Sequence, residues 1–254
     1  MERANRTLRD EIRDYWSDRA ATFDDQPGHE IFVDAERRAW HALILRHLPP
    51  GEGRAALDLG CGTGVSSQLL EEVGYSVTGM DWAEPMLARA RAKASAEGRG
   101  ARFLLGDAER TMLPDASVDA VVARHLVWTL VDPEAAFAEW RRVLRPGGRL
   151  LIVDGDFATP TWIARLRRLL PIAAARAADP QAGTHQSILS RVHFSDGARA
   201  EAVAALLARS GFAVDHIDVD LRAIHRAQGR RMTMGERLER GAQHRYAILG
   251  IKAE

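Results

Sequence analysis

Apolar residues recur in short blocks between residues 55 and 154, and the spacing of the blocks predicts strands that alternate with helices. Apolar runs of strand length lie at 55–59, 77–81, 103–105, 118–123 and 144–153. Just before the last run, apolar residues from 135 to 144 recur at the spacing of one helix face. Strands that alternate with helices in this way predict a mostly parallel sheet covered on both faces.

Helical patterns flank this block on both sides. Apolar positions from 8 to 48 predict two helices that are separated by a break at Pro27-Gly28. Downstream, an amphipathic helix is predicted to start after Thr159-Pro160, because proline suits the first turn of a helix.

The C-terminal part of the chain returns to the sheet pattern. A helix is predicted over 197–210, with Ser195 or Asp196 as its cap. A strand is expected near 213–219 and a final strand near 246–251.

Composition and charge are those of a globular α/β protein. The 254 residues, of which 46% are hydrophobic, suffice for one such domain with additions. The formal net charge is zero, so there is no broad attraction to phosphate backbones, and nucleic acid is not expected as a partner.

Cysteine content and terminal sequence bear on location. The single Cys61 cannot form an intramolecular disulfide, which suits a reducing compartment. The charged N-terminus and the absence of an apolar stretch of membrane-spanning length predict a cytoplasmic protein with no membrane partner. Cysteines and histidines are not clustered at the spacing of a metal site, so no metal is expected.

The most specific chemical signal is a glycine-rich turn after the first predicted strand. Asp58-Leu59 ends the strand, and Gly60, Gly62 and Gly64 follow at alternate positions. Glycines in this place let a ligand approach the backbone without interference from a Cβ atom. The turn therefore predicts a nucleotide pocket.

The spacing of these glycines argues against a dinucleotide. A dinucleotide fingerprint reads G-x-G-x-x-G, but Val65 stands at the place of its third glycine. Asp58 would also repel a diphosphate, whereas it could receive a cationic group. A ligand with an amino-acid tail fits this turn better.

The segment from Leu57 to Gly64 resembles the first motif of the class I S-adenosylmethionine (SAM) dependent methyltransferases. The later motifs of that family follow in order at 77–81, 103–108, 118–123 and 144–153. Five such motifs in order identify the chain as a member of the family. Among its relatives, the chain looks most like the ubiquinone and menaquinone biosynthesis type and related small-molecule methyltransferases.

The resemblance implies a Rossmann-like, doubly wound α/β fold. Its mostly parallel sheet would have seven strands, with the last strand antiparallel and joined to its neighbour as a hairpin. The implied parts are an N-terminal helical lid at 1–50, a SAM-binding core at 51–155, a helical substrate cap at 156–200 and the C-terminal part of the sheet at 201–254.

The chemistry of SAM, with S-adenosylhomocysteine as its product, assigns roles to the residues of these motifs. Asp81 ends the second strand, where its two oxygens could accept both ribose hydroxyls. The amides around Gly60, Gly62 and Gly64 would line the methionine part, with Asp58 near its ammonium group. The other predicted contacts are Trp82 and Met86 with adenine, Asp107 and Ala108 with its amino group, Arg124 through its backbone, and Tyr15 from the lid.

Acceptor residues are expected in the lid, after the fourth strand and in the cap. Aromatic side chains with a few histidines suit a modest organic molecule, although they suit a packed cap equally well. The candidates are Phe23, His29, Trp128, Asp156, Phe157, Trp162, His185 and His193.

His125 is the predicted catalytic residue. The reaction is an in-line displacement at a sulfonium methyl group, so the enzyme mainly has to align the nucleophile, the carbon and the sulfur. A base is needed only where the acceptor arrives protonated. His125 follows the fourth strand at the carboxyl edge of the sheet, where it could serve as that base, or it could be a structural hydrogen-bond partner.

Other functions stay open from the sequence. RNA or protein methylation is disfavoured by the zero net charge and by the segment 154–157, which lacks the Asn/Asp-Pro-Pro-aromatic motif of some such enzymes. A SAM-binding enzyme or regulator that transfers no methyl group and a nicotinamide-dependent oxidoreductase are further alternatives. Both a monomer and a homodimer are compatible with the sequence.

Overall fold

The computed structural model describes residues 6–168 and 182–254, and its centre is a seven-stranded sheet. The strands are β1 (Ala55–Leu59), β2 (Ser76–Asp81), β3 (Arg102–Leu105), β4 (Val118–Arg124), β5 (Leu144–Gly155), β6 (Phe212–Asp218) and β7 (Arg245–Lys252). Their order across the sheet is β3-β2-β1-β4-β5-β7-β6. β1 to β5 pair in parallel, whereas β7 is antiparallel to both of its neighbours. These pairings confirm the predicted Rossmann-like fold with an antiparallel last strand.

Side chains of the central strands alternate between two hydrophobic cores, one on each face of the sheet. Leu57 and Leu59 of β1 belong to the first core, whereas Ala56 belongs to the second. The same alternation separates Leu150 from Leu151 in β5. Because both faces are covered, these strands read in the sequence as nearly continuous apolar runs.

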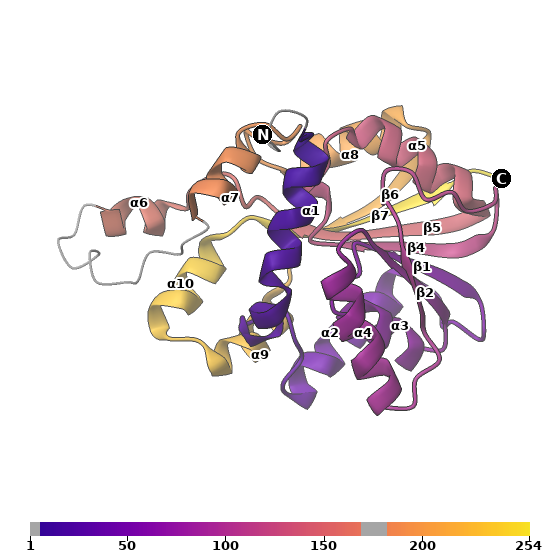
Figure 1. Ribbon diagram of the computed structural model, residues 1–254, viewed down its shortest axis with the longest axis horizontal. Coiled ribbons are helices and arrows are strands. Elements are labelled where there is room, and N and C mark those ends of the chain that lie inside the picture. Colours follow the sequence, from indigo (N-terminus) through magenta and orange to yellow (C-terminus); the bar gives the residue numbers. More distant parts are fainter. Residues whose placement is uncertain (1–5, 169–181) are drawn as a thin grey trace.

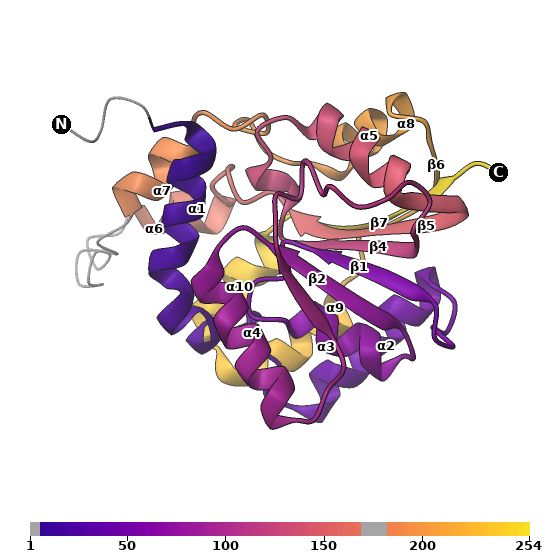
Figure 2. The ribbon, with the colours of Figure 1, turned by 45° about the vertical axis from the view of Figure 1, so that its right-hand side comes forward.

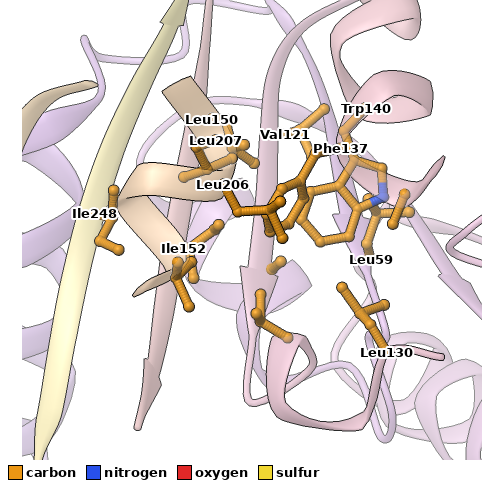
Figure 3. Close-up of a cluster of buried hydrophobic side chains, with 14 of the residues drawn as sticks. Leu59, Val121, Leu130, Phe137, Trp140, Leu150, Ile152, Leu206, Leu207 and Ile248 are labelled. Carbon is orange, nitrogen blue, oxygen red and sulfur yellow. The ribbon is translucent and has the colours of Figure 1, made fainter. Parts of the chain in front are cut away.

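Helices form a layer on each face of the sheet. α5 (Pro133–Val143) and α8 (Ala200–Arg209) lie on one face (Figure 1). Figure 3 shows Phe137 and Trp140 of α5 packed together with Val121 and Leu206 in this first core. α2 (Asp34–His47), α3 (Val65–Glu72) and α4 (Glu84–Ala96) lie on the other face.

Further elements gather at the carboxyl ends of β1 to β5. α1 (Leu8–Arg19) lies beside α7 (Ala182–Leu189), with which it shares a small core of Ile12, Tyr15, Ile188 and Val192 (Figures 1 and 2). The other elements of this region are η1 (Ala20–Asp25), η2 (Val127–Thr129) and α6 (Trp162–Arg168). Across the described residues, every helix is too short or too polar to cross a membrane.

The connection between the last two strands differs from the prediction. β6 and β7 pair antiparallel, but α9 (Arg222–Gln228), η4 (Gly229–Arg231) and α10 (Met234–Ala242) lie between them instead of a hairpin turn. α10 buries none of its residues, so it adds no side chain to the hydrophobic cores.

Two further sequence predictions concern the N-terminal cap of α8 and the substrate cap. The predicted cap of α8 at Ser195 or Asp196 is wrong, because the helix begins at Ala200 after Arg199, which makes no side-chain capping bond. Residues 169–181 of the predicted substrate cap lie outside the described residues.

Phe137→Ala should lower the free energy of unfolding by about 3–5 kcal/mol, the usual cost of truncating a buried aromatic side chain. Phe137 is 0% exposed in the first core and does not line the cavity described below. Urea denaturation followed by circular dichroism measures the change. Leu45→Ala on α2, where Leu45 is 46% exposed, is the control and should cost less than about 1 kcal/mol. Equal losses in the two variants would contradict this description of the core.

Candidate active site

A cavity of about 490 Å³ opens at the carboxyl ends of the parallel strands. Its volume lies in the usual range for small-molecule sites, about 300–1,000 Å³. Doubly wound sheets bind their ligands at this edge. Most of the predicted site residues line the cavity: Tyr15, Phe23, His29, Gly60, Gly62, Asp81, Trp82, Met86, Asp107, Ala108, Arg124, His125, Trp128, Phe157 and His185.

The glycine turn and Asp81 form one hydrogen-bonded unit at the first end of the cavity. Asp81 Oδ2 accepts from the Gly62 amide at 2.9 Å, and Asp81 Oδ1 accepts from the Ala83 amide at 2.9 Å. Gly62 has a φ of +53°, which favours glycine, and a Cβ atom here would meet only Phe23 Cε1, at 3.8 Å. The backbone of the turn is therefore open to a ligand.

Burial and hydrogen bonding act in opposite directions on Asp81. Loss of hydration raises the pKa of its carboxyl, whereas the bonds from the Ala83 and Gly62 amides lower it. The net pKa is raised. Asp107 lies at the same end of the cavity, and its Oδ1 accepts from the Glu109 amide at 2.8 Å. Two carboxyl groups thus face this end, which is suited to hydroxyl, amino or cationic groups of a ligand.

Asp58 and Gly64 do not line the cavity, in contrast to the prediction. Asp58 is 1% exposed beneath the turn, and its Oδ2 accepts from Ser67 Oγ at 2.6 Å. Burial raises the pKa of Asp58 to about 7. Gly64 is the N-cap of α3, and a Cβ atom there would lie 3.2 Å from Ala90 Cβ and from Phe103 Cζ. Both residues shape the turn from below and are not brought to the cavity wall.

Three predicted acceptor residues also lie away from the cavity. Asp156 is buried and accepts from the Thr159 amide at 2.9 Å, so its carboxylate orders the chain after β5. Trp162 is 67% exposed on α6. His193 packs edge-on against Phe194, with ring centroids 4.8 Å apart. Residue type alone did not distinguish these side chains from cavity residues, because their placement depends on tertiary contacts.

α1 and η1 cover the first end of the cavity. The buried Tyr15 lies with its ring centroid 5.0 Å from that of Trp16 and 5.5 Å from that of His185 of α7. Thr63 Oγ1 donates to Asp24 Oδ1 at 2.5 Å, which ties η1 to the glycine turn. This arrangement encloses the turn beneath the N-terminal helices.

Aromatic rings form the wall at the second end of the cavity. The Phe157 ring lies edge-on to Trp128, at 5.5 Å between centroids, and edge-on to His125, at 5.4 Å. Phe23, whose ring also lies beside Gly62, stacks on His29 with centroids 4.2 Å apart, so this pair connects the wall with the glycine turn. These rings offer an apolar surface, and the two imidazoles add polar atoms to it.

Both histidines of this wall are neutral at pH 7. Burial, and next the charge of Arg124, lower the pKa of His29 to about 4 and that of His125 well below its usual range. His125 has a φ of +57°, and its amide donates to the Val153 carbonyl at 3.0 Å. Its Nδ1 is buried and has no hydrogen-bond partner among the described residues. A neutral imidazole can accept a proton.

Two arginines of the second end were missed from the sequence. Arg240 comes from α10 and Arg245 from the start of β7, and both line the cavity. They are two of 35 lysines and arginines, and no local pattern marks them. Arg245 reaches the site because it pairs with Gly155 in the sheet. Further lining residues that were not predicted include Trp16, Arg19, Thr63 and Glu109.

The residues at the first end fit SAM. Gly62 leaves the backbone of the turn open for an amino-acid tail, and Asp81 stands at the end of the next strand, where a carboxylate suits a ribose diol. A Rossmann-like sheet that carries this pair at its carboxyl edge defines a class I SAM-dependent methyltransferase.

Comparison with known proteins agrees with this class. The methyltransferase-domain family matches residues 57–152. A demethylmenaquinone methyltransferase of Thermus thermophilus is 35% identical over 199 residues, which cover 74% of this chain and 87% of the relative. The nocamycin O-methyltransferase of Saccharothrix syringae is 33% identical over 216 residues, which cover 81% and 75%. The chain belongs to the class I SAM-dependent methyltransferases, and it is an enzyme that uses SAM.

Solved structures share the fold. Phosphoethanolamine N-methyltransferase 2 of Haemonchus contortus, solved in complex with SAM, superposes with a TM-score of 0.70. The match has 16% sequence identity and covers 100% of this chain and 62% of that chain. At this identity the likeness concerns the fold.

Asp58 should make stability depend on pH between about 4 and about 7. Its folded pKa of about 7 exceeds the usual 3.8, so within this window the folded protein holds a proton that the unfolded chain has lost. The free energy of unfolding therefore falls as pH rises through the window. Asp58→Asn removes this contribution. The free energy of unfolding of the variant, relative to that of wild type, should therefore increase from about pH 5 to about pH 8.

Urea denaturation of both proteins at the two pH values measures this difference. Asp154, whose pKa burial also raises to about 7, is present in both proteins and cancels in the comparison. Parallel pH profiles of the two proteins would show that Asp58 does not titrate in this window.

Proposed function

We propose that this enzyme transfers the methyl group of SAM to a small organic acceptor bound in the same cavity. One observation carries the proposal: the cavity extends from the glycine turn to the wall of aromatic rings and histidines, so that donor and acceptor can meet inside it. The names of the two sequence relatives specify small organic acceptors, demethylmenaquinone and nocamycin, which supports the same substrate class.

In this proposal the first end of the cavity holds SAM. The backbone around Gly60 and Gly62 receives the methionine part, and Asp81 accepts the ribose hydroxyls. Trp82 and Met86 line the cavity next to Asp81 and would pack against the adenine ring. The other contacts are Asp107 and Ala108 with the adenine amino group, Tyr15 from the lid, and the backbone of Arg124.

The N-terminal helices serve as a lid and α7 as part of the substrate cap. Tyr15 and Trp16 are placed over the cavity by the core that α1 shares with α7. The bond between Thr63 and Asp24 fastens the lid to the glycine turn. A closed lid excludes water and holds the two reactants in line, which is the main requirement of a displacement at a methyl group.

His125 is the base we propose for an acceptor that arrives protonated. SAM supplies an electrophilic methyl group on a sulfonium. The neutral His125 ring lies against Phe157 in the acceptor wall, and its buried Nδ1 has no hydrogen-bond partner among the described residues. The acceptor's proton would move to the imidazole as its oxygen or nitrogen attacks. The proposed acceptor neighbours of His125 are Phe23, His29, Trp128, Phe157 and His185.

Formation of S-adenosylhomocysteine from SAM in the presence of a small-molecule extract tests the proposal. Turnover that requires the small-molecule fraction supports it. Binding of SAM without turnover would favour a SAM-binding protein that transfers no methyl group. Turnover only with the RNA or protein fraction would favour a macromolecular acceptor.

Asp81→Ala should weaken SAM binding by about 1–3 kcal/mol, the scale for losing hydrogen bonds to a charged group. Isothermal titration calorimetry measures the change. Asp115→Ala is the control, because the Asp115 side chain is 80% exposed and does not line the cavity. Equal SAM affinities of wild type, Asp81→Ala and Asp115→Ala would overturn the assignment of Asp81 to the ribose. Binding of NAD in place of SAM would overturn the cofactor assignment.

His125→Asn should lower the rate of methyl transfer to a hydroxyl acceptor by about 10²–10⁴-fold, the usual contribution of a general base. Asparagine tolerates the left-handed backbone at this position, so the wall should keep its shape. Single-turnover kinetics at saturating SAM measures the rate, and calorimetry should show unchanged SAM affinity. A full rate in the variant would exclude His125 as the base.

A further inference from the structure

Three arginines from separate elements of the fold line the cavity. They are Arg124 at the end of β4, Arg240 of α10 and Arg245 of β7. Within residues 6–168 and 182–254, no carboxylate makes an ion pair with any of the three. The acceptor wall thus carries positive charge without a matching negative charge in contact with it.

Arg245 is the most available of the three for a ligand. Arg124 donates to the Gly28 carbonyl. Arg240 donates to Gln228 Oε1 at 3.0 Å and to the Pro27 carbonyl at 2.8 Å. Arg245 donates through Nε to Gln243 Oε1 at 3.1 Å. In the described part of the chain, its two terminal nitrogens have no acceptor, which leaves the forked side of the guanidinium free.

The acidic residues near this cluster are bonded elsewhere. Asp154 accepts from the Val127 and Gly155 amides. Glu36 accepts from Gln228 at 2.9 Å. Glu236 belongs to the capping box of α10, and Glu30 forms an ion pair with Lys93 of α4. Burial, followed by repulsion from the other two arginines, lowers the pKa of Arg245 well below its usual range. A buried charge in this state is unfavourable until an opposite charge joins it.

We propose that the methyl acceptor carries an oxyanion, a carboxylate or a phosphate, which binds to Arg245 within the field of Arg240 and Arg124. The inference rests on the proposed function, because it names the class of acceptor for the same cavity. A guanidinium fork matches the two oxygens of such a group and can bind both.

The neighbours of Arg245 indicate how the rest of the acceptor lies. The Arg245 guanidinium is 5.0 Å from the centroid of the Phe157 ring, and Phe157 contacts both Trp128 and His125. An acid group on Arg245 therefore places the organic body against Phe157 and Trp128, with its reacting atom toward His125. The anion also offsets the arginine charges that lower the pKa of His125, so the imidazole becomes a stronger base when the acceptor binds.

The test compares acids with their neutral isosteres on wild-type protein saturated with S-adenosylhomocysteine. The probes are benzoate and phenyl phosphate, with benzamide as the neutral control, and calorimetry measures their affinities. We expect at least one acid to bind about 10-fold or more tightly than benzamide, because hydrogen bonds to a charged group are stronger than those to a neutral group. The tighter of the two acids distinguishes a carboxylate from a phosphate. Equal affinities, or no binding of either acid, would overturn the proposal.

Arg245→Met tests the residue that we assign. The preference for the acid should fall below about 3-fold in this variant, whereas Arg209→Met, at an exposed arginine outside the cavity, should keep it. The unfolding midpoint of Arg245→Met without probes should rise, because a buried uncompensated charge is removed. A lower midpoint would indicate a protein partner for Arg245 and count against the proposal. Failure of wild-type protein to bind S-adenosylhomocysteine would instead overturn the proposed function.

Discussion

The parallel pairing of β1 with β2 and β4 is the constraint on which the site depends. Leu59 pairs with Met80 on one side and with Ala123 on the other, so the three strands end at the same edge of the sheet. The glycine turn after β1, the carboxylate that ends β2 and the histidine after β4 therefore converge on one cavity. Asp81 then joins the first two of these segments through its bond to the Gly62 amide. None of the segments would form the site alone.

The lid depends on this edge in turn. Several polar contacts attach it: among them, Arg9 of α1 bonds to Glu109, and Asp24 of η1 accepts from Thr63. Glu109 itself accepts from the Val131 amide at 2.6 Å, which connects the lid to the segment after β4. The hydrophobic core that α1 shares with α7 adds apolar packing to these polar contacts, so the lid is held over the cavity by both kinds of contact.

The sequence predicted best those residues whose positions follow from local pattern. Gly62 and Asp81 could be placed because Gly62 lies in the turn after one strand and Asp81 ends the next, and parallel strands bring such positions together. Asp58 was expected in the cavity, but strand alternation turned its side chain beneath the turn, to Ser67. Arg245 could not be found, because its place depends on the pairing of β7 with β5, across a connection whose polar helix α10 has no buried stripe.

The charges of the cavity differ between its two ends, and this difference suits the reaction that we propose. Carboxyl groups of Asp81 and Asp107 face the end at which SAM, a cation at its sulfonium, would bind. Guanidinium groups, Arg245 foremost, face the end assigned to the acceptor. A cationic donor and an anionic acceptor are each attracted to one end and repelled from the other, so the field of the protein orders them along the cavity before any closer contact forms. Alignment of a nucleophile with a methyl carbon is the main requirement of the transfer, and opposite charges at the two ends supply part of it without a dedicated catalytic group. The buried arginines, unfavourable for the stability of the free protein, are in this view the part of the structure that selects and orients the substrate.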